Sequence, residues 1–150
     1  MFYYVIVILA VIFTIPAKAD GLKEQLVGVW ALASCNSAVP WCGVNPNGIQ
    51  ILDASGHYTI LHIARGRPNN GRADRPRDII SAEEYKAIAM GVQANFGTWS
   101  IDEATKTMTW HIEGSLFPGA EGADFKSTIS LSGDELKLGN TTLVWRRIRN

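Results

Sequence analysis

The chain has 150 residues, with 14 basic and 14 acidic side chains, and 47% of its residues are hydrophobic. This length suits one domain with a hydrophobic core. The balanced charge gives no long-range attraction to nucleic acid or to an anionic membrane surface, so neither class of partner is expected.

Residues 1–19 have the pattern of a secretory signal peptide. They carry no charged side chain before Lys18 and end in Ala17-Lys18-Ala19, the small-x-small pattern of a signal-peptidase site. The segment lacks a cationic N-terminal region, so an uncleaved anchor stays open as an alternative. We expect cleavage after Ala19, a domain of residues 20–150, and a periplasmic or secreted protein without a later membrane span.

Cys35 and Cys42 are the only cysteines, and six residues lie between them. In an exported chain this pair predicts a disulfide, which would stabilise the fold by about 2–3 kcal/mol through a short closed loop. No histidine or acidic residue lies between or just beside them, so we expect no metal site. We expect no other cofactor either.

Strand-like runs recur along the chain, separated by turn signals. Residues 53–56 and Gly139-Asn140 suit tight hairpin turns, so consecutive strands should pair antiparallel. If eight such strands close into a barrel, no edge strand is left unpaired. The interior of an eight-stranded barrel is either filled by side chains or holds one small ligand. The sequence therefore predicts an all-β, up-and-down barrel with strands at 27–34, 48–54, 57–63, 96–102, 107–114, 124–131, 135–139 and 141–148.

One helix is expected between the third and fourth strands, at residues 81–96. Ser81 followed by Glu84 forms a capping-box pattern at its start. An apolar face should pack on one end of the barrel, and it comprises Tyr85, Ile88, Ala89 and Val92.

Residues 65–78 form a loop that holds five of the eight arginines. Two interpretations stay open. The loop is a solvated segment partly neutralised by Asp74 and Asp78, or it is a cationic lid over a ligand's carboxylate or phosphate, with Arg67 as a ligand-binding candidate. No aromatic residue is interleaved with these arginines, which argues against nucleic-acid binding.

Four segments resemble the lipocalin-like domain family of bacterial and fungal proteins: LVGVWALAS, PNGIQILDASGHYTI, FGTWSIDEATKTMTWHIEGSLFPGAEG and LSGDELKLG. The most specific piece is HIEGSLFP. The resemblance extends over nearly all of the chain after residue 20 and implies a lipocalin-type barrel and, by analogy, an apolar small-molecule ligand. It implies no catalytic residue, because fold does not fix function.

The hairpin of residues 96–114 indicates which faces point inward. A loop at 102–107 places Trp99 opposite Trp110, with Ile101 opposite Met108 and Gly97 opposite Ile112. Burial of two tryptophans outweighs any gain from the polar face, so this side should face the interior. By alternation the lining should also include Tyr58, Ile60, Phe125, Ile129, Leu131, Leu136, Leu138, Ile49 and Ile51.

His111 and Glu113 share the opposite face of their strand. A pair of this kind is ordinarily a surface contact of little energetic value. If the strand curls over the barrel rim at Gly114, the same pair could instead act as acid and base. His57 and His62 are expected to be structural or solvated.

Three functional hypotheses follow. The leading one is an exported, non-enzymatic carrier or sensor of a small apolar molecule, bound by Trp99, Trp110, Ile112, Tyr58, Ile60, Phe125 and Arg67. The second is an isomerase or cyclase of an apolar metabolite that uses His111 and Glu113. The third is a filled barrel that serves as an interaction module. A large apolar cavity would favour the carrier, a polar pocket that holds His111 would favour the enzyme, and a solid interior would favour the module.

The resemblance also implies that a first-strand tryptophan, Trp30, packs across the closed end beneath an arginine of the last strand. Arg146 and Arg147 are the candidates, and adjacent residues of a strand face opposite ways. Alternation leaves the choice open, and we favour Arg146.

Overall fold

A computed structural model describes residues 21–35, 42, 47–67, 81–139 and 142–149. The predicted signal peptide and most of the arginine-rich loop lie outside the described residues. Among the described helices, none is long and apolar enough to cross a bilayer.

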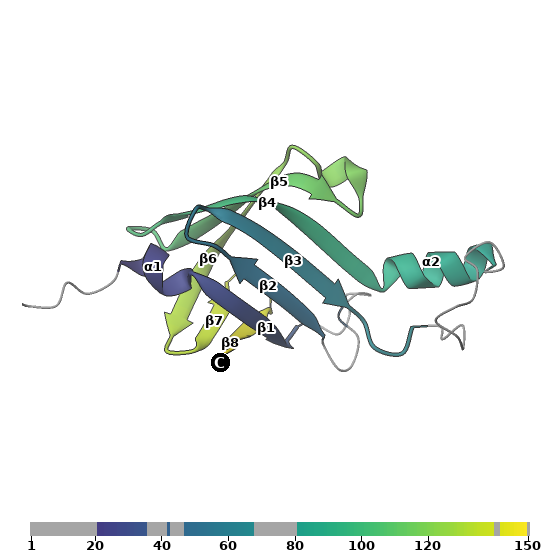
Figure 1. Cartoon of the computed structure of the whole chain (residues 1–150), viewed down its shortest axis with the longest axis horizontal. Helices are drawn as coiled ribbons and strands as arrows, with labels where there is room; N and C mark the ends of the chain where they lie inside the picture. Colours follow the sequence, from purple (N-terminus) through teal and green to yellow (C-terminus); the bar gives the residue numbers. More distant parts are fainter. Residues whose placement is uncertain (1–20, 36–41, 43–46, 68–80, 140–141, 150) are drawn as a thin grey trace, which may run out of the picture.

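Eight antiparallel strands close into one barrel (Figure 1). Each strand pairs with its neighbour in sequence, and the first pairs with the last. This confirms the predicted up-and-down barrel. The strands are β1 (Gly28–Ser34), β2 (Gly48–Leu52), β3 (His57–Ile63), β4 (Val92–Asp102), β5 (Thr107–Ser115), β6 (Asp124–Ser132), β7 (Glu135–Leu138) and β8 (Val144–Arg147).

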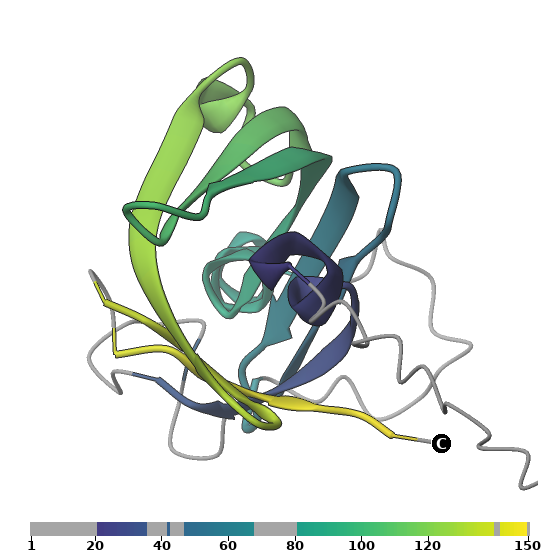
Figure 2. The ribbon, with the colours of Figure 1, turned by 90° about the vertical axis from the view of Figure 1, so that its left-hand side faces the viewer.

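A short helix, α1 (Leu22–Leu26), closes one end of the barrel. Figure 2 looks onto this end and shows α1 lying across it. Leu26 of α1 is fully buried, and the Lys23 ammonium lies 5.8 Å from the centroid of the Trp99 ring. Neither α1 nor the 3-10 helix η2 (Pro118–Ala120) was predicted, because neither is long enough to show helical periodicity.

Helix α2 (Ala82–Met90) follows β3 and precedes β4. Its capping box is formed as predicted: the Ser81 hydroxyl accepts from the Glu84 backbone N–H, and the Glu84 carboxylate accepts from that of Ser81. The capping groups satisfy two backbone donors at the start of the helix.

The predicted end and packing of this helix were wrong. It ends at Met90, and residues 92–96 belong to β4, where Val92 pairs with Ile63 at the end of β3. Val92, Ala94 and Phe96 alternate with polar residues, a strand pattern that the helix prediction overlooked. No residue of α2 is buried, and the helix projects from the barrel end in Figure 1 instead of packing its apolar face there.

The β4–β5 hairpin has the predicted register. Trp99 pairs with Trp110 and Ile101 with Met108, and a bulge follows at Phe96/Gly97. The side chains of Trp99 and Trp110 are buried, at 4% and 2% exposure. Both tryptophans therefore face the barrel interior.

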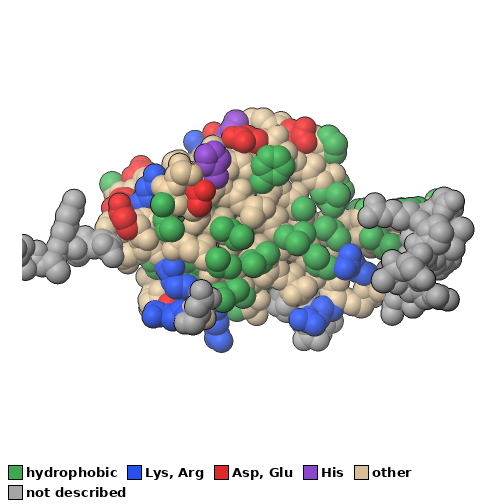
Figure 3. Space-filling model, viewed as in Figure 1, with side chains coloured by type: hydrophobic (Ala, Val, Ile, Leu, Met, Phe, Trp, Pro, Cys, Tyr) green, Lys and Arg blue, Asp and Glu red, His purple; other side chains and the backbone are tan. Residues whose placement is uncertain are grey.

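Strand β2 faces opposite to the prediction. Gln50 and Leu52 are buried, whereas Ile51 is 38% exposed. Hydrophobic side chains gather on the face of the barrel seen in Figure 3. Gln50 pairs with Ile60, and Leu52 pairs with Tyr58. Directly paired residues share a face, so inward β3 residues require Gln50 to point inward despite its polarity.

Arg147, not Arg146, closes the barrel over Trp30. Its guanidinium carbon lies 4.2 Å from the Trp30 ring centroid, and the group donates to the carbonyls of Val27 (2.8 Å) and Gln25. Trp145 is fully buried, so Arg147 two residues later points to the same side of β8. The prediction of Arg146 was wrong, because Arg146 lies on the exposed face.

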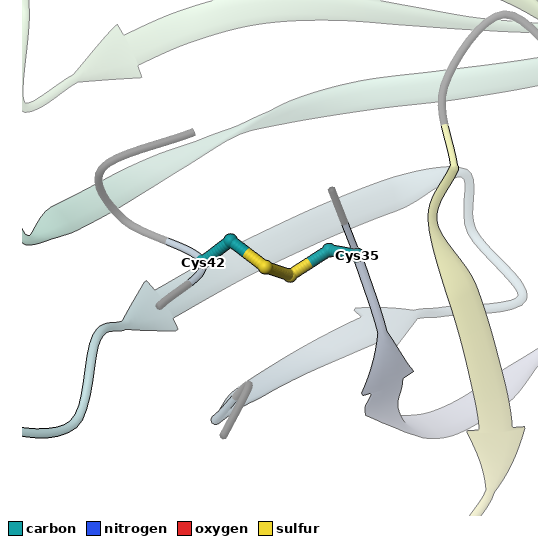
Figure 4. The surroundings of a disulfide bond; sticks show 2 residues. All are labelled: Cys35 and Cys42. Atoms are coloured by element: carbon teal, nitrogen blue, oxygen red, sulfur yellow. A yellow bond between two sulfur atoms is a disulfide. The ribbon is translucent and has the colours of Figure 1, made fainter. Parts of the chain in front are cut away.

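The predicted disulfide between Cys35 and Cys42 is confirmed (Figure 4). Cys35 directly follows β1, at the end of the barrel away from α1, and Cys42 is buried. The two Cα atoms are 6.0 Å apart. The bond ties the end of the first strand to the segment that leads into β2.

Candidate ligand-binding cavity

The barrel interior is divided into a filled half and an open half. On the α1 side, large side chains pack without exposure, among them Trp30, Leu52, Met108 and Leu136. In the other half a cavity of about 290 Å³ remains. The filled half forms the floor of this cavity.

One wall of the cavity is polar. It is formed by the inward residues of β2, β3 and β4, where His62 pairs directly with Gln93 and Ile60 lies between Gln50 and Asn95. Because alternate residues of a strand share a face, the polar side chains of three neighbouring strands come together. Tyr58 extends this wall towards the floor.

The opposite wall is apolar and aromatic. The Trp110 and Phe125 ring centroids are 5.5 Å apart, and the Trp145 ring lies 5.1 Å from that of His62. Phe125 is 41% exposed and so reaches solvent as well as the cavity. Residues of β5 to β8 and of the segment before β8 make up this wall: Trp110, Ile112, Phe125, Leu138, Leu143 and Trp145.

Several buried polar atoms of the lining have no hydrogen-bond partner among the described residues. They are both side-chain polar atoms of Gln50, the Tyr58 hydroxyl and the indole nitrogens of Trp110 and Trp145. A buried polar group left unpaired costs about 1–3 kcal/mol. Such groups are normally satisfied by protein, water or ligand. The cavity is therefore suited to a polar or partly polar occupant.

The titratable groups of the lining are neutral near pH 7. Burial lowers the pKa of His62 to about 4, an effect that the Gln93 side chain partly opposes. Burial, with a smaller contribution from Glu113, raises the pKa of Tyr58 to about 12. Among the described residues that line the cavity, none carries a charge at neutral pH.

A sequence model of the lipocalin-like domain matches residues 27–148. The chain belongs to the lipocalin-like domain family. The matched span starts directly before β1 and ends directly after β8, so the family domain corresponds to the barrel itself. A search of curated proteins gives no significant match.

Five of the residues predicted to bind ligand line the cavity of this lipocalin-like barrel: Tyr58, Ile60, Trp110, Ile112 and Phe125. Their role in binding stays a prediction. Trp99 lies in the filled half, where its indole N–H donates to the Asp53 carbonyl at 3.2 Å. Arg67 also lies outside the lining, since its Nε donates to the Ala64 carbonyl at 3.0 Å.

His111 and Glu113 of the lipocalin-like barrel are both exposed, and neither lines the cavity. His111 Nδ1 is 2.8 Å from Asp124 Oδ1, and both side chains are 49% exposed. The register places Asp124 directly opposite His111, whereas Glu113 lies two residues along the same strand. The cross-strand carboxylate is therefore the contact of His111, and the predicted acid–base pair does not reach the cavity.

The β2–β3 turn contains a serine beside a histidine that sequence reasoning overlooked. Ser55 Oγ lies 2.7 Å from Asp53 Oδ1 and 2.8 Å from His57 Nδ1. The single hydroxyl proton is donated to Asp53, so His57 Nδ1 must be the donor to Ser55. That nitrogen cannot accept the Ser55 proton, and the three side chains serve to order an exposed turn.

The polar wall of the lipocalin-like barrel was the main feature missed from the sequence. His62 could have been placed by extending the alternation of Tyr58 and Ile60 by one step. Gln93 and Asn95 were hidden because residues 92–96 were assigned to the helix. No group of three potential metal-ligating side chains occurs among the described residues.

Proposed function

We propose that this lipocalin-like protein binds a small molecule in its barrel cavity and acts as an exported binding or carrier protein. The observation that carries the proposal is the cavity of about 290 Å³ whose buried polar atoms lack partners among the described residues. Family membership and the closed barrel support a ligand-binding role, which eight-stranded barrels can fulfil.

The open half of the interior favours a binding protein over an interaction module. A module needs only a solid barrel, with all inward positions used for packing. Here the side chains around Trp30 provide a rigid floor, and the space above it stays open. Rigid walls around a preformed cavity lower the entropic cost of binding.

The proposal contains no catalytic step. The acid–base pair predicted for an isomerase or cyclase, His111 and Glu113, is exposed and lies outside the cavity lining. A general base must come within hydrogen-bond reach of the proton that it removes. Neither side chain lines the cavity.

Export is part of the proposal and rests on the sequence and the disulfide. The apolar segment of residues 1–19 has a cleavage pattern, and the Cys35–Cys42 bond is of a kind that persists in oxidising compartments. N-terminal sequencing of protein recovered from its host should give Asp20 as the first residue. A start at Met1 with membrane association would support the uncleaved anchor.

Binding is tested with two bicyclic probes, naphthalene and quinolin-2-one, measured by isothermal titration calorimetry. Ile60→Trp fills the cavity from β3, and Thr59→Trp adds the same ring to the exposed face of that strand. We expect the wild type and Thr59→Trp to bind at least one probe, and Ile60→Trp to bind it at least tenfold more weakly. Unchanged affinity in a folded Ile60→Trp variant would place binding elsewhere.

A further inference from the structure

We infer that the ligand is an uncharged, flat molecule with an apolar ring face and one edge that carries both hydrogen-bond donors and acceptors. This inference rests on the proposed function and specifies the chemical class of the ligand. It depends on how the polar and aromatic groups are distributed around the cavity, which is neither wholly apolar nor charged.

Gln50 is the central observation. Its side chain is fully buried, and neither its amide nitrogen nor its amide oxygen has a partner among the described residues. A primary amide offers two donor hydrogens and one acceptor oxygen. The complementary group is another amide-like edge, in which a carbonyl accepts from the Gln50 nitrogen while a neighbouring N–H donates to the Gln50 oxygen.

The remaining unpaired groups favour a ligand rich in acceptors. The indole nitrogens of Trp110 and Trp145 can only donate, and the Tyr58 hydroxyl can donate one hydrogen. Donors therefore outnumber acceptors among the unpaired atoms of the lining. A ligand with one N–H and at least two acceptor positions, such as a lactam, a cyclic urea or a related heterocycle, would satisfy most of them.

The absence of charge from the described lining disfavours an ionised ligand. His62 is the one basic group in that lining, and burial lowers its pKa to about 4, so the imidazole is neutral at pH 7. A carboxylate or an ammonium group placed there would lose its hydration without gaining an opposite charge. The cavity should therefore select the neutral form of a ligand.

The opposite wall accounts for the flat, apolar part of the molecule. Trp110 and Phe125 present tilted rings 5.5 Å apart, and Trp145 continues this aromatic surface. Aromatic rings pack well against other flat rings in offset or edge-to-face geometry. The volume of about 290 Å³ equals that of about ten water molecules, so a molecule of one or two rings fits.

Three probes that share a fused two-ring framework separate the possible ligand classes. Quinolin-2-one carries a neutral lactam edge, naphthalene has no polar atom, and 2-naphthoate carries a negative charge. We expect calorimetry at pH 7 to show that the wild type binds quinolin-2-one at least tenfold more tightly than either of the other two.

The contribution of Gln50 is tested with Gln50→Leu, which keeps much of the volume and removes both polar atoms. The matched control is Gln25→Leu, because Gln25 is exposed on α1 at the other end of the barrel. We expect Gln50→Leu to lose most of the preference for quinolin-2-one over naphthalene and Gln25→Leu to retain it. Tyr58→Phe, which removes one hydroxyl, should also reduce the preference for quinolin-2-one over naphthalene. This variant replaces Gln50→Leu in the test if Gln50→Leu does not fold.

The outcomes distinguish this inference from the proposed function. Equal affinity for naphthalene and quinolin-2-one, or tightest binding of 2-naphthoate, would overturn the ligand class and leave the binding cavity intact. A preference for quinolin-2-one that survives both Gln50→Leu and Tyr58→Phe would also overturn it. Failure of all three probes to bind would contradict both proposals.

Discussion

The guanidinium of Arg147 stacks on the indole of Trp30 at 4.2 Å and reaches across to the carbonyl groups of Val27 and Gln25. Trp30 in turn donates its indole N–H to the Leu26 carbonyl at 2.9 Å. The last strand is thereby joined to α1 and to the first strand at the same point. The floor of the cavity is held in place by this cluster.

Arg147→Met should lower the free energy of unfolding by about 2–3 kcal/mol, because it removes a sheltered cation–π contact and hydrogen bonds to two carbonyls. Arg146→Met is the matched control, since Arg146 is exposed on the same strand. That variant should change stability by no more than about 0.5 kcal/mol. Urea denaturation of both variants measures the difference, and equal losses would contradict the assignment of Arg147.

Trp110→Ala should lower the free energy of unfolding by about 3–5 kcal/mol, the range for truncation of a packed aromatic side chain. His111→Ala, at the next residue and exposed, should cost little, because a half-exposed histidine–carboxylate contact contributes little to stability. Thermal and urea denaturation provide the measurement. A loss below about 1 kcal/mol for Trp110→Ala would be inconsistent with its inward position.

The buried His62 predicts a loss of stability in weak acid. Its pKa is about 4 in the folded protein, against 6.5 when unperturbed. Between these two values the unfolded chain binds the additional proton, so stability falls as the pH drops from about 6.5 to about 4 and this contribution is constant below that range. The loss is about 3 kcal/mol, at 1.36 kcal/mol per pH unit.

His62→Gln removes this titration and keeps a polar side chain on the wall. Comparison of urea denaturation curves for the wild type and His62→Gln across pH 4 to 7 isolates the contribution of the imidazole from that of surface carboxylates. The pKa values of Asp53 and Asp134 are lowered by their hydrogen bonds, so those groups act mainly below this window. The same slope in both proteins would show that His62 is not the titrating group.

Reduction of the Cys35–Cys42 bond should lower the melting temperature without unfolding the barrel. The closed loop is short, so its loss costs only about 2–3 kcal/mol in chain entropy. Thiol labelling of denatured, unreduced protein should find no free cysteine, and far-UV circular dichroism should change little on reduction. Two labelled thiols before reduction would contradict the disulfide.

Gly97→Ala should be strongly destabilising. A Cβ atom added at Gly97 would lie 2.0 Å from the His111 carbonyl oxygen, a backbone atom that cannot move without disturbing the β4–β5 pairing. Gly119→Ala is a suitable control, since an added Cβ meets nothing within 4 Å there. We expect a loss of more than about 2 kcal/mol for the first variant and almost none for the second.

The sequence predicted the barrel well wherever large apolar side chains and short turns act together. The pairing of Trp99 with Trp110 followed from one tight loop and the burial of two tryptophans. The face of β2 was wrong because the rule that apolar residues point inward fails where a polar residue is needed inside, as at Gln50. The inward position of Gln50 follows only from its pairing with Ile60 of β3.

Two further errors have different physical origins. Val92 completes the apolar face of the predicted helix, and this hid the strand alternation of Val92, Ala94 and Phe96, whose partner strand is remote in sequence. The choice between Arg146 and Arg147 was a question of strand parity. Trp145 is larger than Val144 and is therefore the residue that points inward. Arg147, two residues after Trp145, lies on the same side of β8.

We expect Gln50 to favour ligand recognition at a cost in stability. Because its amide is buried without a partner among the described residues, replacement by leucine should raise the melting temperature even as it weakens discrimination between ligands. Selection for expression or heat resistance alone would thus enrich aliphatic residues here. In a mutational scan that scores yield and ligand capture separately, Gln50 should stand out as a position where the two scores have opposite sign.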